Sequence, residues 1–96
     1  MSLQWQRNDE GRIALQGDLT RQTVPEFWQQ RRQWLVAGRP LELEMQAVEH
    51  VDSAGVALLI EVKRALKDAS LTLQNPSKQL VDIAHVSGVH ELLSLS

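Results

Sequence analysis

Apolar residues alternate with polar ones in several short segments, and this rhythm predicts strands. Residues 3–7 and 12–17 both follow it, with turn-forming residues 8–11 between them. A strand with one buried face has this period of two, and the short connection favours an antiparallel hairpin. Residues 41–48 repeat the alternation and residues 70–74 follow it again, so a third and a fourth strand are expected.

The first helix is expected to begin at Thr23. Thr23 and Glu26 match a capping box, in which each side chain satisfies a backbone N–H group at the helix start. Pro25 lies in the first turn, where its missing N–H group does no harm. Gly38 is the expected residue just beyond the helix end.

Two further helices are predicted, over residues 54–69 and from Ser77 to about Val86. Residues 89–95 indicate a short final strand or helix. The order is β-β-α-β-α-β-α, in which the later strands run parallel with right-handed crossovers. We therefore predict an α/β fold: a mixed sheet of four to five strands with an N-terminal antiparallel hairpin, helices packed on it, and one domain over residues 1–96.

Composition narrows the class of protein. The 96 residues are 43% apolar, and 10 basic and 12 acidic residues leave a formal charge of -2. This balance gives no general attraction for nucleic acid or anionic lipid. The absence of cysteine excludes disulfides and thiolate metal sites. We find no signal peptide and no apolar run near the roughly 18 residues that span a bilayer, so a cytoplasmic protein without direct membrane insertion is expected.

Polar residues follow two strands that are expected to be neighbours. Asp18 and Thr20 follow the second strand, and Asp52 and Ser53 follow the third. Loops after parallel strands gather at the carboxyl edge of a sheet, where binding sites usually form. These four side chains are therefore expected to lie close together.

Ser53 has two interpretations from local sequence. It can simply cap the second helix, which contributes about 1 kcal/mol. Alternatively, its hydroxyl is exposed, and a phosphate on it would meet free N–H groups at the positive end of the helix dipole. We expect Gly55 to let another backbone approach closely, and Asp52 to bind a loop N–H group or to position Ser53.

The second helix carries apolar residues on both of its sides. At about 100° per residue, Val56, Ala57 and Ile60 fall on the outward arc with the charged residues. Single exposed apolar residues are common in proteins. Three of them beside the turn, flanked by Lys63 and Arg64, favour a docking surface.

Catalytic motifs are missing from the sequence. It has no phosphate-binding glycine loop, no dinucleotide fingerprint and no nucleophile elbow. His50, His85 and His90 do not have metal-ligand spacing, so no metal or cofactor is expected. An enzyme that uses Ser53 with Asp18 or Asp52 would lack an obvious base, and we predict no enzyme.

The element order and the turn Asp52-Ser53-Ala54-Gly55 together resemble the STAS domain over nearly the whole chain. In that family, this turn carries a hydroxyl that an anti-sigma kinase can phosphorylate. The chain is also similar to family members that are small cytoplasmic subunits of Gram-negative phospholipid ABC transporters of the Mla type, which serve outer-membrane lipid asymmetry. That likeness rests on Gly17-Asp18-Leu19, Phe27-Trp28, the turn and residues 71–74, although such subunits are expected to have threonine where Ser53 stands.

The resemblance implies two possible functions. The first is a non-catalytic accessory subunit that binds the transporter's ATPase subunit and, through it, an inner-membrane permease at the inner face of the cytoplasmic membrane. The alternative is an anti-sigma-factor antagonist, whose partner is an anti-sigma factor with serine kinase activity and which phosphorylation of Ser53 switches. The expected partner-binding residues are Asp18, Thr20, Asp52, Ser53, Ala54, Gly55, Val56, Ala57, Ile60, Lys63 and Arg64.

Overall fold

A four-stranded sheet forms the base of the computed structural model, which describes residues 2–8 and 10–95. Its strands lie in the chain order, β1-β2-β3-β4. The first pair is antiparallel and the next two pairs are parallel, which confirms the predicted hairpin and the parallel pairing of the later strands. The strands are β1 (Leu3–Arg7), β2 (Ile13–Leu19), β3 (Leu41–Val51) and β4 (Leu71–Gln74).

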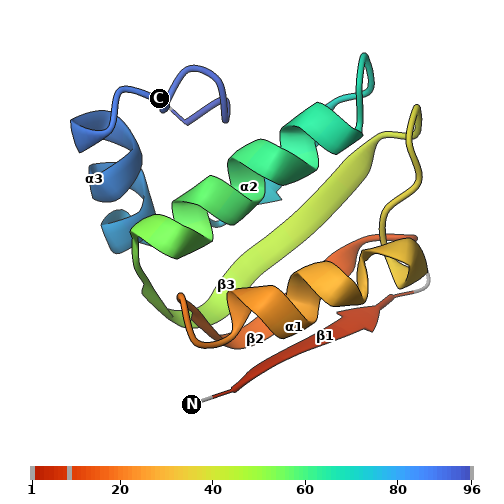
Figure 1. Ribbon diagram of the computed structural model, residues 1–96, viewed down its shortest axis with the longest axis horizontal. Helices are drawn as coiled ribbons and strands as arrows, with labels where there is room; N and C mark the ends of the chain where they lie inside the picture. The colour runs from red at the N-terminus through yellow and green to blue at the C-terminus, as the bar shows by residue number, and fades with distance from the viewer. Residues whose placement is uncertain (1, 9, 96) are drawn as a thin grey trace.

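Helices α1 and α2 cover one face of this sheet. Helices α1 and α2 cross it side by side, and α3 lies beside α2 near the end of β3 (Figure 1). Gln79 of α3 accepts a hydrogen bond from the Val51 backbone N–H group at 2.8 Å, which ties α3 to the end of that strand. The helices are α1 (Val24–Gln29), α2 (Ser53–Ala65) and α3 (Lys78–Val86).

The core lies between the sheet and these helices. Apolar side chains at alternate positions of β2 and β3 meet the inner sides of α2 and α3 there, as the period of two requires. The largest fully buried side chains are Ile13, Leu15, Leu19, Leu43, Met45, Leu59, Leu66, Leu80, Leu93 and Val62.

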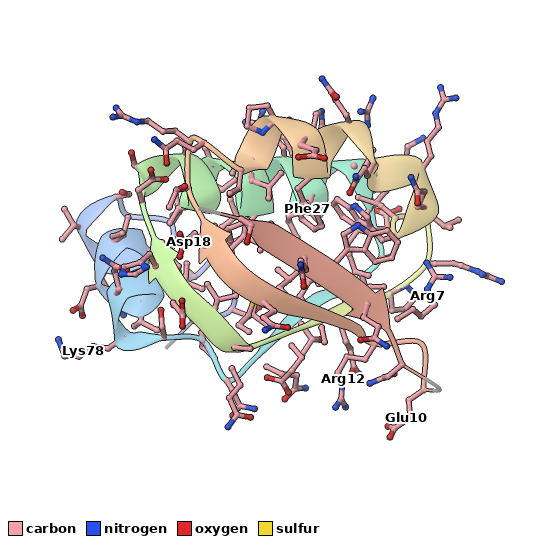
Figure 2. The ribbon with its side chains drawn as sticks, turned by 90° about the horizontal axis from the view of Figure 1, so that it is seen from below. Arg7, Glu10, Arg12, Asp18, Phe27 and Lys78 are labelled. Atoms are coloured by element: carbon pink, nitrogen blue, oxygen red, sulfur yellow. The ribbon has the colours of Figure 1, made fainter. Side chains whose placement is uncertain are left out.

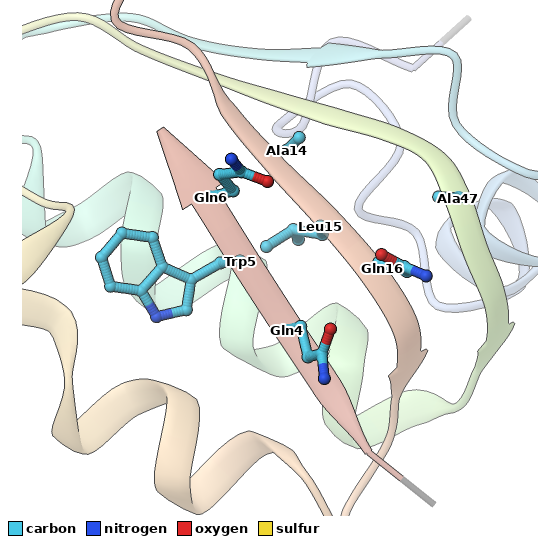
Figure 3. Close-up of a pocket in the computed structure, with 7 residues that line it drawn as sticks. All are labelled: Gln4, Trp5, Gln6, Ala14, Leu15, Gln16 and Ala47. Atoms are coloured by element: carbon cyan, nitrogen blue, oxygen red, sulfur yellow. The ribbon is translucent and has the colours of Figure 1, made fainter. Parts of the chain in front are cut away.

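The opposite face of the sheet is polar and open. In Figure 2 this face looks away from α1 and α2, and Arg12 projects from it. The Arg12 Nε atom donates to Glu42 at 2.8 Å, which links β2 to β3. Figure 3 shows a shallow pocket on the sheet with Gln4, Gln6 and Gln16 around it.

The first helix is shorter than predicted, and the predicted capping box is wrong. Helix α1 ends at Gln29, and a 3-10 turn over Arg31–Gln33 follows it. The Thr23 hydroxyl donates to the Asp18 carbonyl at 2.7 Å and accepts from the Thr20 N–H group at 3.1 Å, so it braces the preceding loop instead of the helix start. Beyond the helix, the Trp34 ring stacks on Phe27 with ring centroids 4.3 Å apart.

The third helix confirms its predicted cap, whereas other element ends shift. The Ser77 hydroxyl accepts from the Leu80 N–H group at 3.1 Å. Helix α2 stops at Ala65 rather than residue 69, because Lys67 has a left-handed φ of 58° that a helix cannot continue through. Residues 89–95 form turns instead of a strand or helix, although Leu93 and Leu95 are buried as closing hydrophobes.

Within residues 2–8 and 10–95, no helix has the length and apolar character required to cross a bilayer.

Candidate functional site

Strands β2 and β3 end beside each other, and the two polar loops leave the sheet together. Leu19 pairs with Val51 at the last position of the register. The Asp52 N–H group then donates to the Leu19 carbonyl at 3.3 Å, so the contact between the strands continues into the turn. The predicted meeting of these loops at one edge of the sheet is confirmed.

Asp52 is the residue that holds this turn together. It occupies the N-cap of α2, where its Oδ1 atom accepts from the Gly55 N–H group at 3.1 Å. Its Oδ2 atom accepts from the Arg21 N–H group at 3.0 Å. The prediction that Asp52 binds a loop N–H group is confirmed. Ser53 lies next to the N-cap, but the capping role considered for it falls to Asp52, whose carboxylate has two oxygens that accept from both partners.

Ser53 is the first residue of α2, and it is exposed. Its side chain lies at the mouth of a hollow of about 440 Å³ that Thr20, Arg21, Gln22 and Asp52 also line. The Thr20 hydroxyl oxygen is buried there, and it has no hydrogen-bond partner within the described part of the chain. Arg21 and Gln22 join this hollow through the loop after β2, and no pattern in the sequence distinguishes them from ordinary loop residues.

Gly55 sits where the start of α2 crosses the end of β2. A Cβ atom added at Gly55 would lie 2.3 Å from the Leu19 carbonyl oxygen, closer than any real side chain tolerates. The predicted close approach of another backbone is therefore confirmed. Ala54, one residue earlier, is half-buried.

One residue of the predicted docking surface lies inside the protein. Val56 is only 3% exposed and belongs to the core, so its placement on the outward arc of α2 is wrong. Ile60 is half-buried against the core, whereas Ala57 is exposed. Helices α1 and α3 both contact α2 while the sheet lies beneath it, so its buried side extends further around the helix than the predicted inward arc and includes Val56.

A narrower strip of α2 remains in contact with solvent. We call it the α2 face. It comprises the exposed residues Ser53, Ala57, Glu61 and Arg64, with the half-buried residues Ile60 and Lys63 at its edge. Arg64 donates to Glu61 at 3.1 Å.

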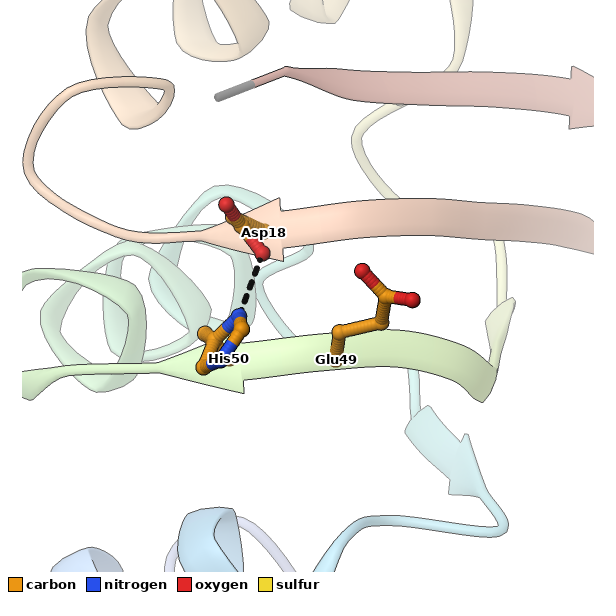
Figure 4. Close-up of side chains that lie close together, drawn as sticks. All are labelled: Asp18, Glu49 and His50. Carbon is orange, nitrogen blue, oxygen red and sulfur yellow. Dashed lines mark hydrogen bonds and ion pairs between the residues drawn. The ribbon is translucent and has the colours of Figure 1, made fainter.

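Asp18 and Thr20 do not share one environment. Thr20 lines the hollow beside Ser53, but Asp18 turns to the neighbouring strand. Its Oδ1 atom lies 2.9 Å from Nδ1 of His50, and Glu49 stands next to them (Figure 4). His50 lies on β3, which extends beyond the predicted residues 41–48, and its contact with Asp18 depends on the register of β2 and β3 and was not predicted.

Comparison with known proteins agrees with this fold and turn. A family model described as "Mlab, STAS domain" matches residues 2–94. The chain belongs to the STAS domain family, as its resemblance predicted. A particular relative is similar over almost its whole length. The chain is 31% identical over 93 residues to the intermembrane phospholipid transport system binding protein MlaB of Haemophilus influenzae. The matched region covers 91% of this chain and 89% of that protein.

Proposed function

We propose that this protein is a non-catalytic accessory subunit of a phospholipid-transporting ABC complex of the Mla type. The observation that carries the proposal is the full-length similarity to a protein named as a binding protein of an intermembrane phospholipid transport system. In this role the protein binds the ATPase subunit on the cytoplasmic side. That subunit connects it to the permease in the inner membrane.

The contact in this proposal is made by the Asp52–Ser53 turn and the α2 face. The hollow beside Ser53 can receive a protruding side chain of the partner, and the small side chain of Ala57 allows close approach. Arg64 adds a charge at the rim, where charged residues typically surround an interface. Gly55 and Val56 contribute by shaping the turn from beneath, because both are buried.

No chemistry is required of the protein in this role. A partner that binds only one state of the ATPase subunit increases the population of that state. The environment of Ser53 agrees with such a role, since the imidazole of His50 is engaged by Asp18 and the Asp52 carboxylate accepts two backbone N–H groups.

The alternative function is an anti-sigma-factor antagonist that is switched by phosphorylation. The exposed hydroxyl of Ser53 at the first position of α2 favours it. Phosphorylation would add roughly -1.5 to -2 charges at neutral pH, next to the carboxylate of Asp52. That charge would expel a closely packed partner.

Affinity purification of the tagged protein from cell membranes tests the proposal. We expect an ABC ATPase and its permease to be recovered. Ala57→Arg and Ser53→Lys should each reduce that recovery by roughly tenfold or more, because each puts a long cation into the contact. Gln6→Arg introduces the same kind of charge on exposed β1, at a distance from the turn, and should leave recovery unchanged.

Two results would contradict the proposal. One is undiminished recovery of the ATPase with Ala57→Arg and Ser53→Lys, which would contradict the proposed contact while leaving the accessory role in place. The other is recovery of a soluble serine kinase in place of the ATPase, with phosphate found on Ser53 by mass spectrometry, which would support the alternative function instead.

A further inference from the structure

A second group of polar side chains stands on β2 and β3 just before the turn. It consists of Asp18, Glu49 and His50, and one ligand atom from each lies within 4.8 Å of the others. An imidazole and two carboxylates are ligand types that proteins use for divalent metal ions. The three ligands come from two strands, which explains why the spacing of the histidines along the chain gave no sign of a site.

An irregularity in strand pairing brings these side chains together. Gly17 pairs with Val48 and Asp18 pairs with His50, so Glu49 is an extra residue in β3. In a regular strand, Glu49 and His50 would point to opposite faces of the sheet. A bulge sets two residues of one strand opposite one residue of its partner and redirects their side chains, and such bulges are uncommon between parallel strands. Figure 4 shows Glu49 and His50 both beside Asp18.

Asp18 is the fixed member of the group. Its side chain is only 11% exposed, whereas that of His50 is 68% exposed. The Asp18 backbone is held on both sides, because its N–H group donates to the Ser2 carbonyl at 2.8 Å and its carbonyl accepts from Thr23 at 2.7 Å. A ligand that is already positioned loses little conformational entropy when a metal binds.

The geometry lies close to what coordination requires. Two ligand atoms about 2.1 Å from one tetrahedral zinc ion are roughly 3.4 Å apart. The Asp18 and His50 atoms are 2.9 Å apart, so a small outward movement of the exposed imidazole would suffice. Glu49 is exposed, and its side chain can rotate toward the same point.

We propose that Asp18, Glu49 and His50 form a binding site for a divalent first-row transition-metal ion such as Zn²⁺. Three protein ligands leave a coordination position for water, as in other open sites. The imidazole favours such ions over Ca²⁺ and Mg²⁺, which prefer oxygen ligands in larger numbers or in strict octahedral geometry. Two carboxylates supply compensating charge.

The site lies at the same edge of the sheet as the candidate partner contact. His50 is two residues before Asp52, and Asp18 is two residues before Thr20. A bound ion would link β2 to β3 immediately before the hollow. The metal site does not rest on the proposed docking function. Metal binding by the isolated protein therefore tests it separately.

Calorimetric titration of the metal-free full-length protein with ZnCl₂ at neutral pH tests the site. We expect one saturable site per chain, weakened roughly tenfold or more in Glu49→Gln and in His50→Gln. Glu49→His should instead tighten Zn²⁺ and Ni²⁺ binding by about tenfold, because imidazole is the better ligand for these ions. A gain of affinity cannot arise from misfolding.

His85→Gln is the matched control. In the unmodified protein the His85 ring stacks on the His90 ring with centroids 4.0 Å apart, so this pair is another imidazole-rich place on the protein. We expect His85→Gln to leave the affinity unchanged, and paramagnetic Co²⁺ to perturb NMR signals around His50 most strongly. Binding that persists in His50→Gln and Glu49→Gln, binding that is lost in His85→Gln, or no saturation up to about 1 mM ion would overturn the proposal.

Discussion

At the scale of single residues, Asp52 and Gly55 determine the shape of the turn. Asp52 joins the start of α2 to the loop after β2 through two backbone N–H groups. Gly55 lets the first turn of α2 lie directly on the Leu19 carbonyl. Neither residue needs to touch a partner to be essential to the site, because together they fix where Ser53 is presented.

Replacement of Gly55 by alanine should destabilise the protein. The new methyl group would collide with the Leu19 backbone, and overpacking of this kind costs about 1–3 kcal/mol, offset by up to about 1 kcal/mol of helix propensity. We expect a net loss of about 1–2 kcal/mol in the free energy of unfolding, measured by urea denaturation. Ser53→Ala in the same exposed turn should stay within about 0.5 kcal/mol. Equal stability of the two variants would show that the start of α2 is not packed tightly on the Leu19 carbonyl.

At the scale of elements, the orientation of α2 decides which residues can meet a partner. Ser53, Ala57, Glu61 and Arg64 recur at spacings of four, four and three residues, so they form one strip along the exposed side of the helix. Val56 is adjacent to Ala57 in sequence but lies in the core. The exposed side of α2 is therefore a narrow strip with two charged residues rather than a broad apolar patch.

The orientation of α2 can be tested by truncating neighbouring side chains. Val56→Ala should lower the free energy of unfolding by about 2 kcal/mol, since it removes buried methyl groups and leaves a cavity. Ala57→Ser, one position along, should change it by less than about 0.5 kcal/mol. Thermal and urea unfolding of both variants provide the measurement. A Val56→Ala variant with an unchanged free energy of unfolding would show that Val56 is exposed.

At the scale of the whole molecule, one core connects all the elements. Leu15 of β2, Leu43 of β3, Leu59 of α2 and Leu80 of α3 belong to a single cluster of buried side chains. Helices α1 and α2 cover one face of the sheet, and the other face carries polar residues toward solvent (Figures 1 and 2). With no second core among the described residues, cooperative unfolding of the chain is the physical expectation.

Unfolding should therefore occur in one step. The tryptophans report on the region around α1, because Trp5 of β1 donates to Gln30 at 2.9 Å and Trp34 stacks on Phe27. Far-UV circular dichroism instead reports on all the helices and strands. We expect their fluorescence and the far-UV circular dichroism to follow the same urea transition, with a slope of about 1 kcal/mol per molar urea. Two separate transitions would contradict a single cooperative domain.

The sequence by itself determined the kind and order of the elements. Alternation in residues 3–7, 12–17 and 41–48 identifies strands because successive side chains of a strand point to opposite faces. Ser77 identified the start of α3, and the turn at Asp52-Ser53-Ala54-Gly55 identified both the family and the edge of the sheet where the candidate site lies. These signals are local, because each can be read from one short segment of the sequence without knowing what that segment packs against.

Only the tertiary structure decided how these elements share their surfaces. A helical wheel cannot show that Val56 is buried, because α1 and α3 flank α2 and widen its buried arc beyond what one apolar face predicts. The Thr23 hydroxyl does not cap α1 but donates to the Asp18 carbonyl at the end of β2. The contact of Asp18 with His50 arises from a bulge in the pairing of two strands, a property that belongs to neither strand alone.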